Sequence, residues 1–269
     1  TIPLSPPLRD ILQFSARVED NEFGDLDSHQ KELGVRREQR LENWVWGYSV
    51  RGLNESWDVK GARRNNDYLL PGMSLSRRDH SGSAVNPSSG FSQLYSVELA
   101  SAELMSDVDL LRATANFGHI VSLGQRQRLV SRAELGAALV ADGDRSELAP
   151  SLNFFAGGSQ SIRGFSYQSI GNEITVTDAR GNPVKIVVGG ERLVTASVEY
   201  QYQFTEHWRG ALFADGGDAF DEGEFDFNYA LGFGVHYITQ VGAVRLELAN
   251  PLSKDDSSWR FHLAIGAEF

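Results

Sequence analysis

The sequence contains no cysteine, no long apolar run and no excess of basic residues. Without cysteine, a disulfide scaffold, a thiolate metal site and a cysteine nucleophile are excluded. A membrane-spanning helix needs roughly 18 consecutive apolar residues. The sequence has no such run, and its mean hydropathy is -0.31. The net charge of -11 gives nucleic acid no electrostatic reason to bind, so no nucleic-acid partner is expected.

The sequence also lacks a secretory signal and an initiator methionine, because it opens directly on Thr1. The chain is therefore expected to be a piece of a longer protein. No proline-rich, charged or low-complexity block interrupts it, and such blocks usually mark linkers. Residues 1–269 are accordingly expected to form one domain.

What the sequence does contain is apolar residues at every second position. Leu12, Phe14 and Ala16 alternate with polar neighbours, which is the period of a strand with one apolar and one wet face. The same alternation recurs in twelve segments, each of which is predicted to be a strand. These segments are residues 8–20, 28–38, 44–51, 67–78, 91–104, 107–122, 125–141, 194–204, 206–217, 227–237, 244–248 and 259–269.

Charged residues recur on the polar face of these strands, as at Arg132 and Glu134. A packed soluble core would find such charges costly, whereas a wet lumen accepts them. Aromatic residues at the end of a strand, such as Trp44 and Trp46, suit the interfacial girdle of a membrane barrel. The predicted fold is an all-β, antiparallel transmembrane β-barrel of about twelve strands in an outer membrane. A soluble sandwich or jelly roll is the alternative.

One long connection, residues 143–190, breaks the alternation and holds seven glycines between Gly157 and Gly190. A structureless loop of this length usually has a function. We expect it to fold back into the lumen and to carry the cation of Arg163 there. Glu199 and Asp215 lie on inward faces of the next two strands and are the predicted partners of that guanidinium.

Three linked motifs resemble the outer-membrane superfamily of barrel assembly factors and two-partner secretion transporters, also called the bacterial surface antigen family. The first is the arginine-bearing loop motif, Gly157-Gly158-Ser159-Gln160-Ser161-Ile162-Arg163-Gly164-Phe165. The second is the strand motif formed by Phe213, Asp215 and Gly217, preceded one strand earlier by the acid Glu199. The third is the ending from Asn250 to Phe269. The resemblance is strongest to TamA-type proteins and to the transporter domain of patatin-type autotransporters.

The resemblance implies transport or insertion of other polypeptides, and no enzymatic activity. Barrels of this family have sixteen strands preceded by periplasmic POTRA domains, so this chain is expected to lack the POTRA domains and the first four strands. It is expected to be either the carboxy-terminal part of such a barrel or a natural short barrel. Gly266 and Phe269 on the closing strand are expected to tune a lateral seam between the first and last strands. The implied partners are the outer-membrane lipid bilayer, unfolded client polypeptides and a TamB-like periplasm-spanning protein.

Two other functions remain open on the sequence alone, an outer-membrane barrel enzyme and a passive pore. A phospholipase or protease would need a nucleophile or an acid beside a histidine, but Ser197 and His207 are predicted to point inward. Asp215, Asp218 and Asp221 lack the terminal glutamate of a calcium loop, and the histidines show no metal-ligand spacing. No metal or cofactor is expected.

Overall fold

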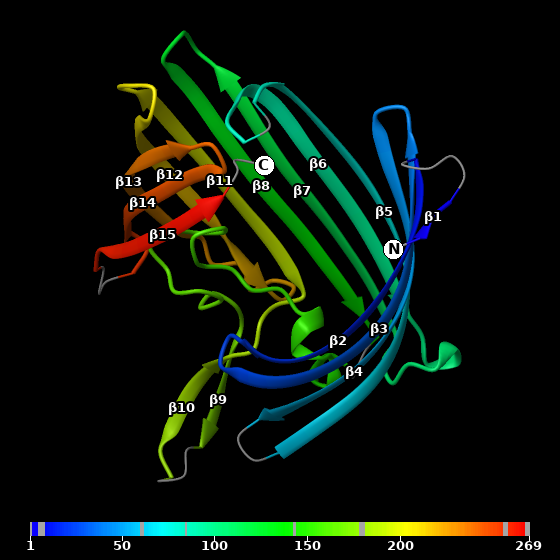
Figure 1. The fold of residues 1–269 in the computed structure, drawn as a ribbon. Coiled ribbons are helices and arrows are strands. Elements are labelled where there is room, and N and C mark those ends of the chain that lie inside the picture. Colours follow the sequence, from blue (N-terminus) through cyan, green and yellow to red (C-terminus); the bar gives the residue numbers. More distant parts are fainter. Residues whose placement is uncertain are drawn as a thin grey trace.

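The computed structural model describes residues 2–4, 9–59, 62–83, 85–141, 144–177, 181–254 and 258–266. Its main feature is an antiparallel sheet of 13 strands, ordered β1 to β8 and then β11 to β15. Strands of this sheet that follow one another in the sequence therefore lie side by side. This includes β8 and β11, which pair although the long connection separates them in the sequence. The sheet curves strongly around that connection (Figure 1).

The strands of this sheet have the following bounds. They are β1 (Ile2–Pro3), β2 (Asp10–Phe23), β3 (Leu26–Leu41), β4 (Trp44–Val59), β5 (Ala62–Gly82), β6 (Pro87–Ala100), β7 (Leu110–Ser122), β8 (Gln127–Val140), β11 (Arg192–Gln203), β12 (Trp208–Phe220), β13 (Asn228–Thr239), β14 (Gly242–Pro251) and β15 (Arg260–Gly266). Their residues alternate between the two faces. On β11, for example, Thr195 and Ser197 are buried whereas Val194 and Val198 are exposed.

The predicted all-β antiparallel class is confirmed, and the twelve predicted strands correspond to β2–β8 and β11–β15. Of the 13 strands of the main sheet, only the short β1 was not predicted. Several strands are longer than expected, most of all β5, which covers Ala62–Gly82 instead of 67–78. Backbone hydrogen bonds continue the ladder through its polar ends, where side-chain alternation gives no signal.

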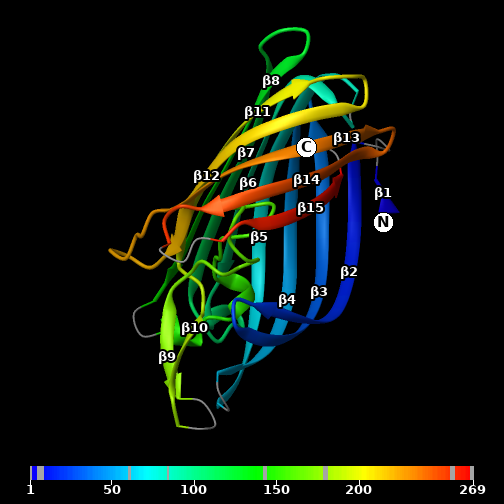
Figure 2. The same cartoon turned by 90° about the vertical axis from the view of Figure 1, so that its left-hand side faces the viewer.

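The sheet does not close into a cylinder. Among the described residues, β1 pairs only with β2 and β15 pairs only with β14. Figure 2 shows β15 running obliquely to β2 instead of alongside it. The expected barrel is therefore an open, barrel-like sheet here. The two edges are unequal, because β15 has 7 strand residues and β2 has 14.

The long connection is not structureless, which corrects the prediction for residues 143–190. It contains two short 3-10 helices, η2 (Arg145–Glu147) and η3 (Pro150–Leu152), and a hairpin of β9 (Glu173–Thr177) and β10 (Pro183–Val187). The hairpin forms because Ile174 pairs with Ile186 and Val176 with Val184, which gives both short strands an apolar side. The helical turns of the described residues each span three residues, and none is long enough to cross a membrane.

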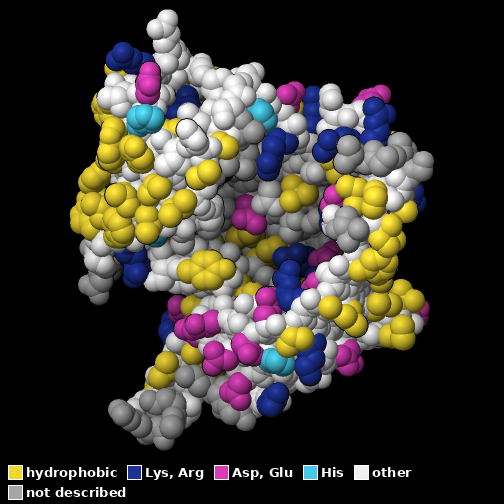
Figure 3. All heavy atoms as spheres, viewed as in Figure 1, with side chains coloured by type: hydrophobic (Ala, Val, Ile, Leu, Met, Phe, Trp, Pro, Cys, Tyr) yellow, Lys and Arg dark blue, Asp and Glu magenta, His cyan; other side chains and the backbone are white. Residues whose placement is uncertain are grey.

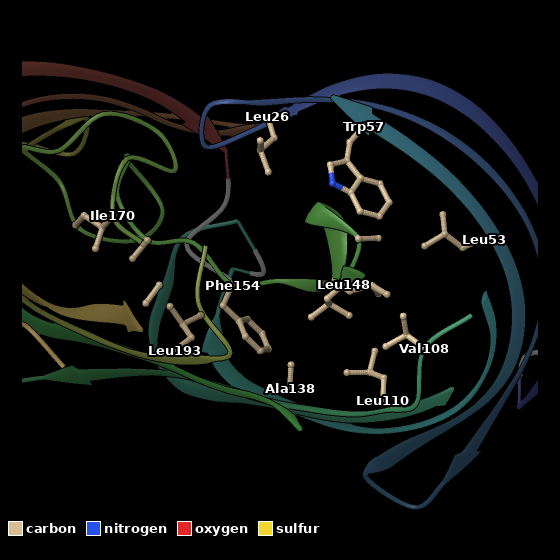
Figure 4. Close-up of a cluster of buried hydrophobic side chains, with 14 of the residues drawn as sticks. Leu26, Leu53, Trp57, Val108, Leu110, Ala138, Leu148, Phe154, Ile170 and Leu193 are labelled. Atoms are coloured by element: carbon tan, nitrogen blue, oxygen red, sulfur yellow. The ribbon is translucent and has the colours of Figure 1, made fainter. Parts of the chain in front are cut away.

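The apolar core lies between this connection and the inner face of the sheet (Figure 4). The connection contributes Leu148, Leu152, Phe154, Ile162, Phe165 and Ile170. The wall contributes Leu53, Trp57, Tyr68, Leu70, Leu110 and Leu193. Burying one large apolar side chain contributes about 1.5–3 kcal/mol, so this contact is a major source of stability. The inner face is therefore wet only where the connection does not cover it.

The outer face of the sheet is apolar. Large side chains at alternate positions are exposed, among them Phe14, Val18, Leu212, Leu231 and Phe233. Soluble proteins rarely expose a continuous apolar surface of this kind, whereas membrane barrels place such a band against lipid. The two faces of the sheet are thus suited to different surroundings.

Candidate functional site

Arg163 lies at the centre of the candidate site, inside the curve of the sheet. It belongs to the connection between β8 and β11, and only 1% of its surface is exposed. Its guanidinium is 2.7 Å from Asp215 on β12, 2.6 Å from Glu199 on β11 and 3.0 Å from Glu247 on β14. Arg163 therefore contacts Asp215 and Glu199, the two acids predicted from the sequence, and also Glu247, which was not predicted.

Each hydrogen-bond donor of the Arg163 side chain has an acceptor. Nε and Nη2 donate to the two carboxylate oxygens of Asp215 at 2.7 and 2.9 Å. Nη1 donates to Glu199 and Glu247, and Nη2 also donates to the hydroxyl of Ser197 at 3.1 Å. Because a guanidinium carries five N–H groups, this set satisfies all of them. The bidentate contact with Asp215 also fixes the plane of the fork.

The site is electrostatically unbalanced without Arg163. Burial by itself lowers the pKa of Arg163, but its hydrogen bonds to Asp215 and the charges of Asp215, Glu199 and Glu247 outweigh burial and raise it above the ordinary arginine value. The ring of Phe213 lies 3.4 Å from the guanidinium carbon and adds a cation–π contact. The arginine consequently stays charged and is held from several directions.

Two glycines let the connection present Arg163 in this position. Gly157 has φ +101° and Gly164 has φ +92°, a region that other residues rarely adopt. A Cβ on Gly157 would lie 2.4 Å from the carbonyl oxygen of Ser166. A Cβ on Gly164 would lie 3.2 Å from Ala230 on β13. Both positions combine the backbone angle and the close approach that favour glycine.

The other predicted residues of the loop motif shape its turn. The N–H of Gly158 donates to the carbonyl of Ile162 at 3.1 Å, and the N–H of Gly157 donates to the hydroxyl of Ser161 at 3.4 Å. Ile162 and Phe165 are buried in the apolar core. The apolar side chains therefore hold the turn against the wall while Arg163 enters the acidic site.

The remaining predicted positions lie on strands. Phe213 and Gly217 are on β12 with Asp215, and Gly217 pairs with Thr195 of β11. Gly266 is the last residue of β15 and pairs with Ala243, four residues along β14 from Glu247 of the acidic site. Phe269 lies outside the described residues.

Sequence analysis missed Glu247 and His236. The Nε2 of His236 lies 3.2 Å from Glu247, and the ring is completely buried. The alternation of β14 does place Glu247 on the inward face, but only the register of β13 with β14 brings it to Arg163. Glu199, His236 and Glu247 lie close enough together to hold a metal ion. In this structure the guanidinium of Arg163 contacts both carboxylates, so an arginine supplies the positive charge.

A second arginine, Arg145, anchors the beginning of the connection. Its guanidinium lies 3.0 Å from Asp221 at the end of β12, and it donates to Asn153 at 2.8 Å and to the carbonyl of Gly189 at 3.0 Å. These bonds join the first and last parts of the connection. Asp221 is thus paired with an arginine.

The connection also touches both ends of the sheet. In the β2–β3 turn, the N–H of Asp25 donates to the carbonyl of Val187 at 3.1 Å, and the N–H of Val187 donates to the Asp25 carboxylate at 2.7 Å. At the other end, the N–H of Gly164 donates to Nε2 of His262 on β15 at 2.9 Å. One segment therefore bridges the first long hairpin and the last strand.

The serine considered for an enzyme has a structural partner. Ser197 points inward as predicted, and its hydroxyl bonds Arg163 and Arg132. No hydrogen bond to a histidine is found for it within the described ranges. His207 was predicted to point inward but lies exposed in the β11–β12 turn, because β12 begins only at Trp208.

Comparison with known proteins places this geometry in a family. The chain matches the Omp85 superfamily domain over residues 12–269. Among solved structures, BamA from Haemophilus ducreyi lacking POTRA domains 1-3 is similar with a TM-score of 0.80 and 16% identity, covering 96% of this chain and 59% of that one. CdiB from Acinetobacter baumannii has a TM-score of 0.45 and 12% identity, covering 96% of this chain and 53% of that one.

The chain spans less than two thirds of the length of either structure. The similarity to BamA, at this identity, concerns the fold. The family match, in contrast, covers all but the first eleven residues and agrees with the resemblance seen in the three motifs. The chain therefore belongs to the Omp85 superfamily, a family of outer-membrane β-barrel proteins.

Proposed function

We propose that this chain is the membrane domain of a protein that inserts unfolded polypeptides into the outer membrane or secretes them across it. The observation that carries the proposal is the buried contact of Arg163 with Asp215, Glu199 and Glu247. The contact joins the loop motif and the strand motif of the family. An apolar outer face and a partly charged inner face support a membrane position for the sheet.

In this proposal, residues 1–269 act as one barrel domain, and client polypeptides engage it at a seam. The seam is the separation between β15 and the β1–β2 end of the sheet. Both edges present unpaired backbone groups in the described residues, and such edges pair readily with an additional strand. Gly266, at the end of β15, lies on one of these edges.

The connection that carries Arg163 regulates the seam in this proposal. Its contacts with Asp25 and His262 reach the two ends of the sheet, and the acidic site holds its middle. A seated connection keeps the ends at a fixed separation, and a displaced connection frees them. A TamB-like periplasm-spanning protein is the proposed partner that delivers or receives clients.

The test compares Arg163→Ala with Arg145→Ala in the full-length protein reconstituted into liposomes. Insertion of an unfolded outer-membrane polypeptide is followed by its protection from protease. Arg163→Ala is expected to slow insertion strongly, whereas Arg145→Ala, which removes the other arginine anchor of the connection, is expected to slow it less. Heat-modifiable migration on gels verifies that both variants are folded. Wild-type insertion by folded Arg163→Ala protein would remove the role of the motif.

A further inference from the structure

A cavity lies beside the tip of the connection and next to the acidic site, with which it shares Ser197. Its volume is about 740 Å³, and it is bounded by β5, β6, β7, β8 and β11 of the sheet and by Gln160 and Ser161 of the connection. Figure 3 shows the molecule hollowed at its centre, with acidic and basic side chains around the hollow. Pockets for small ligands and side chains are typically about 300–1,000 Å³, so this cavity is large enough to hold one.

The cavity exists because small residues separate two arginines on one row of the inner face. Cross-strand partners share a face, and the register aligns Arg78 with Ser92, Ser92 with Gly118, and Gly118 with Arg132. Ser92 and Gly118 leave open space between the two guanidinium groups. Arg40 lies on the neighbouring row and also lines the cavity.

The cavity has an excess of positive charge. Arg40, Arg78 and Arg132 make no ion pair with any carboxylate in the part of the chain that the structure describes. Its lining has four arginines, Arg40, Arg77, Arg78 and Arg132, against three acids, Glu42, Asp79 and Glu134. This differs from the rest of the inner face, where arginines are generally paired with acids. Three unpaired arginines facing one space are a typical arrangement for binding anions.

The cavity reaches the end of the sheet that has short turns. Glu42 and Asn43, in the turn between β3 and β4, belong to its lining. The longer connections, such as residues 141–191 and 221–227, lie at the opposite end of the strands. In outer-membrane barrels the short turns face the periplasm, which is the side from which an unfolded client arrives.

The cavity is also coupled to the acidic site through one hydroxyl. Ser197 accepts a hydrogen bond from Arg163 at 3.1 Å and another from Arg132 at 3.5 Å. A ligand that draws Arg132 into the cavity therefore changes the surroundings of the residue that holds the connection. Occupancy of the cavity and seating of Arg163 are linked by this contact.

From these observations we propose that the cavity binds aspartate or glutamate side chains of an extended client segment during its entry. The inference rests on the proposed function, because only that function supplies an unfolded client polypeptide. A carboxylate matches the unpaired guanidinium groups, and Gln160 and Ser161 offer hydrogen bonds to a polypeptide backbone. A lipid headgroup is disfavoured, because the arginines of the cavity lie on the inner face of the sheet, away from the apolar outer face.

The test measures binding of a fluorescein-labelled peptide of alternating aspartate and glycine to the detergent-solubilised full-length protein by fluorescence anisotropy. Arg132→Gln and Arg78→Gln are each expected to weaken binding about tenfold, the effect of losing one charged hydrogen bond. The matched control is Arg126→Gln, which removes a charge from the exposed β7–β8 turn outside the cavity and is expected to leave affinity unchanged. Higher ionic strength should weaken binding.

A peptide with asparagine in place of aspartate, inorganic phosphate and anionic lipid vesicles complete the comparison. Weak binding of the asparagine peptide supports the inference. Equal affinity of wild type and Arg132→Gln for the aspartate peptide overturns it, and so does competition by lipid vesicles but not by the unlabelled aspartate peptide. Competition by phosphate alone shows a small-anion site and also overturns it. If one of these results overturns the inference while polypeptide insertion still requires Arg163, the proposed function is unaffected.

Discussion

The strands before the long connection and the strands after it differ in how their buried charged side chains are paired. In the first group, Arg51 on β4 lies 2.7 Å from Glu98 and 3.1 Å from Glu32, so this arginine is paired with acids of the sheet itself. In the second group, the three acids around Arg163 depend on a cation from outside the sheet. The Arg51 group needs no charge from the connection, whereas the acids around Arg163 receive their cation only when the connection is seated.

Burial differs in the same direction. The side chains of Arg51, Glu32 and Glu98 retain 17–22% exposure, whereas those of Arg163 and its three acids retain 0–8%. Removing one partner of a fully buried ion pair leaves an uncompensated buried charge. At a partly exposed ion pair, water can take the place of the missing partner. The second group should therefore respond far more strongly to the loss of a single charge.

The largest expected effect is that of Arg163→Ala. It leaves three buried carboxylates without their shared cation, and loss of one partner of a buried pair typically costs about 3–5 kcal/mol. Urea unfolding in detergent micelles, followed by tryptophan fluorescence, measures the change. Arg163→Lys keeps the charge without the fork and should fall between wild type and alanine. A loss below that of an exposed pair would show that the second group does not depend on the connection.

A smaller effect is expected for Gly232→Ala on β13. The added Cβ would lie 2.2 Å from the Phe213 ring, which contacts the guanidinium of Arg163, and 2.5 Å from the carbonyl oxygen of Leu248, so both the ring and the β14 backbone must shift. Overpacking of this kind costs about 1–3 kcal/mol. The matched control is Gly52→Ala on β4, where a Cβ meets nothing within 4 Å. The same unfolding assay should separate the two variants, and equal losses would contradict the role of the ring.

Glu98→Gln tests the first group directly. Arg51 keeps its contact with Glu32, and the site admits some water, so we expect a loss of about 1 kcal/mol. The measurement is the urea midpoint of the variant beside that of Arg163→Ala. If Glu98→Gln were the more damaging substitution, the contrast between the two groups would be reversed.

The smallest effect is expected for Lys185→Gln on the β9–β10 hairpin. Lys185 lies 3.0 Å from Glu173, but its side chain is 74% exposed. Exposed ion pairs contribute roughly 0–1 kcal/mol, so the unfolding midpoint should hardly change. This variant sets the baseline for the other three, and a clear destabilisation would show that the hairpin contributes to the fold.

Much of the fold could be predicted because alternation is a property of each strand alone. The positions of Phe14 and Val18, or of Val194 and Val198, indicate an apolar face even when the neighbouring strands are not known. The loop and strand motifs likewise pointed to Arg163, Glu199 and Asp215. The β9–β10 hairpin was missed because its two strands have five residues each within a glycine-rich segment, too short for a clear period.

The rest of the site depends on register, which the sequence does not state. Glu247 reaches Arg163 because it pairs with Gly234 of β13, and a shift of one residue would turn it to the outer face. The cavity arises in the same way from the alignment of Ser92 and Gly118 between two arginines. The open edges of the sheet also follow from how far the curvature carries each end, a property of the whole sheet.

The connection's bonds to Asp25 and to His262 make it behave as an intramolecular bivalent ligand. Once one anchor has formed, the tethered second anchor binds at a high effective concentration, so the pair holds more firmly than either contact alone. Detachment is then concerted, because each anchor promotes rebinding of the other. Moving the first hairpin away from the last strand requires at least one of these two attachments to break.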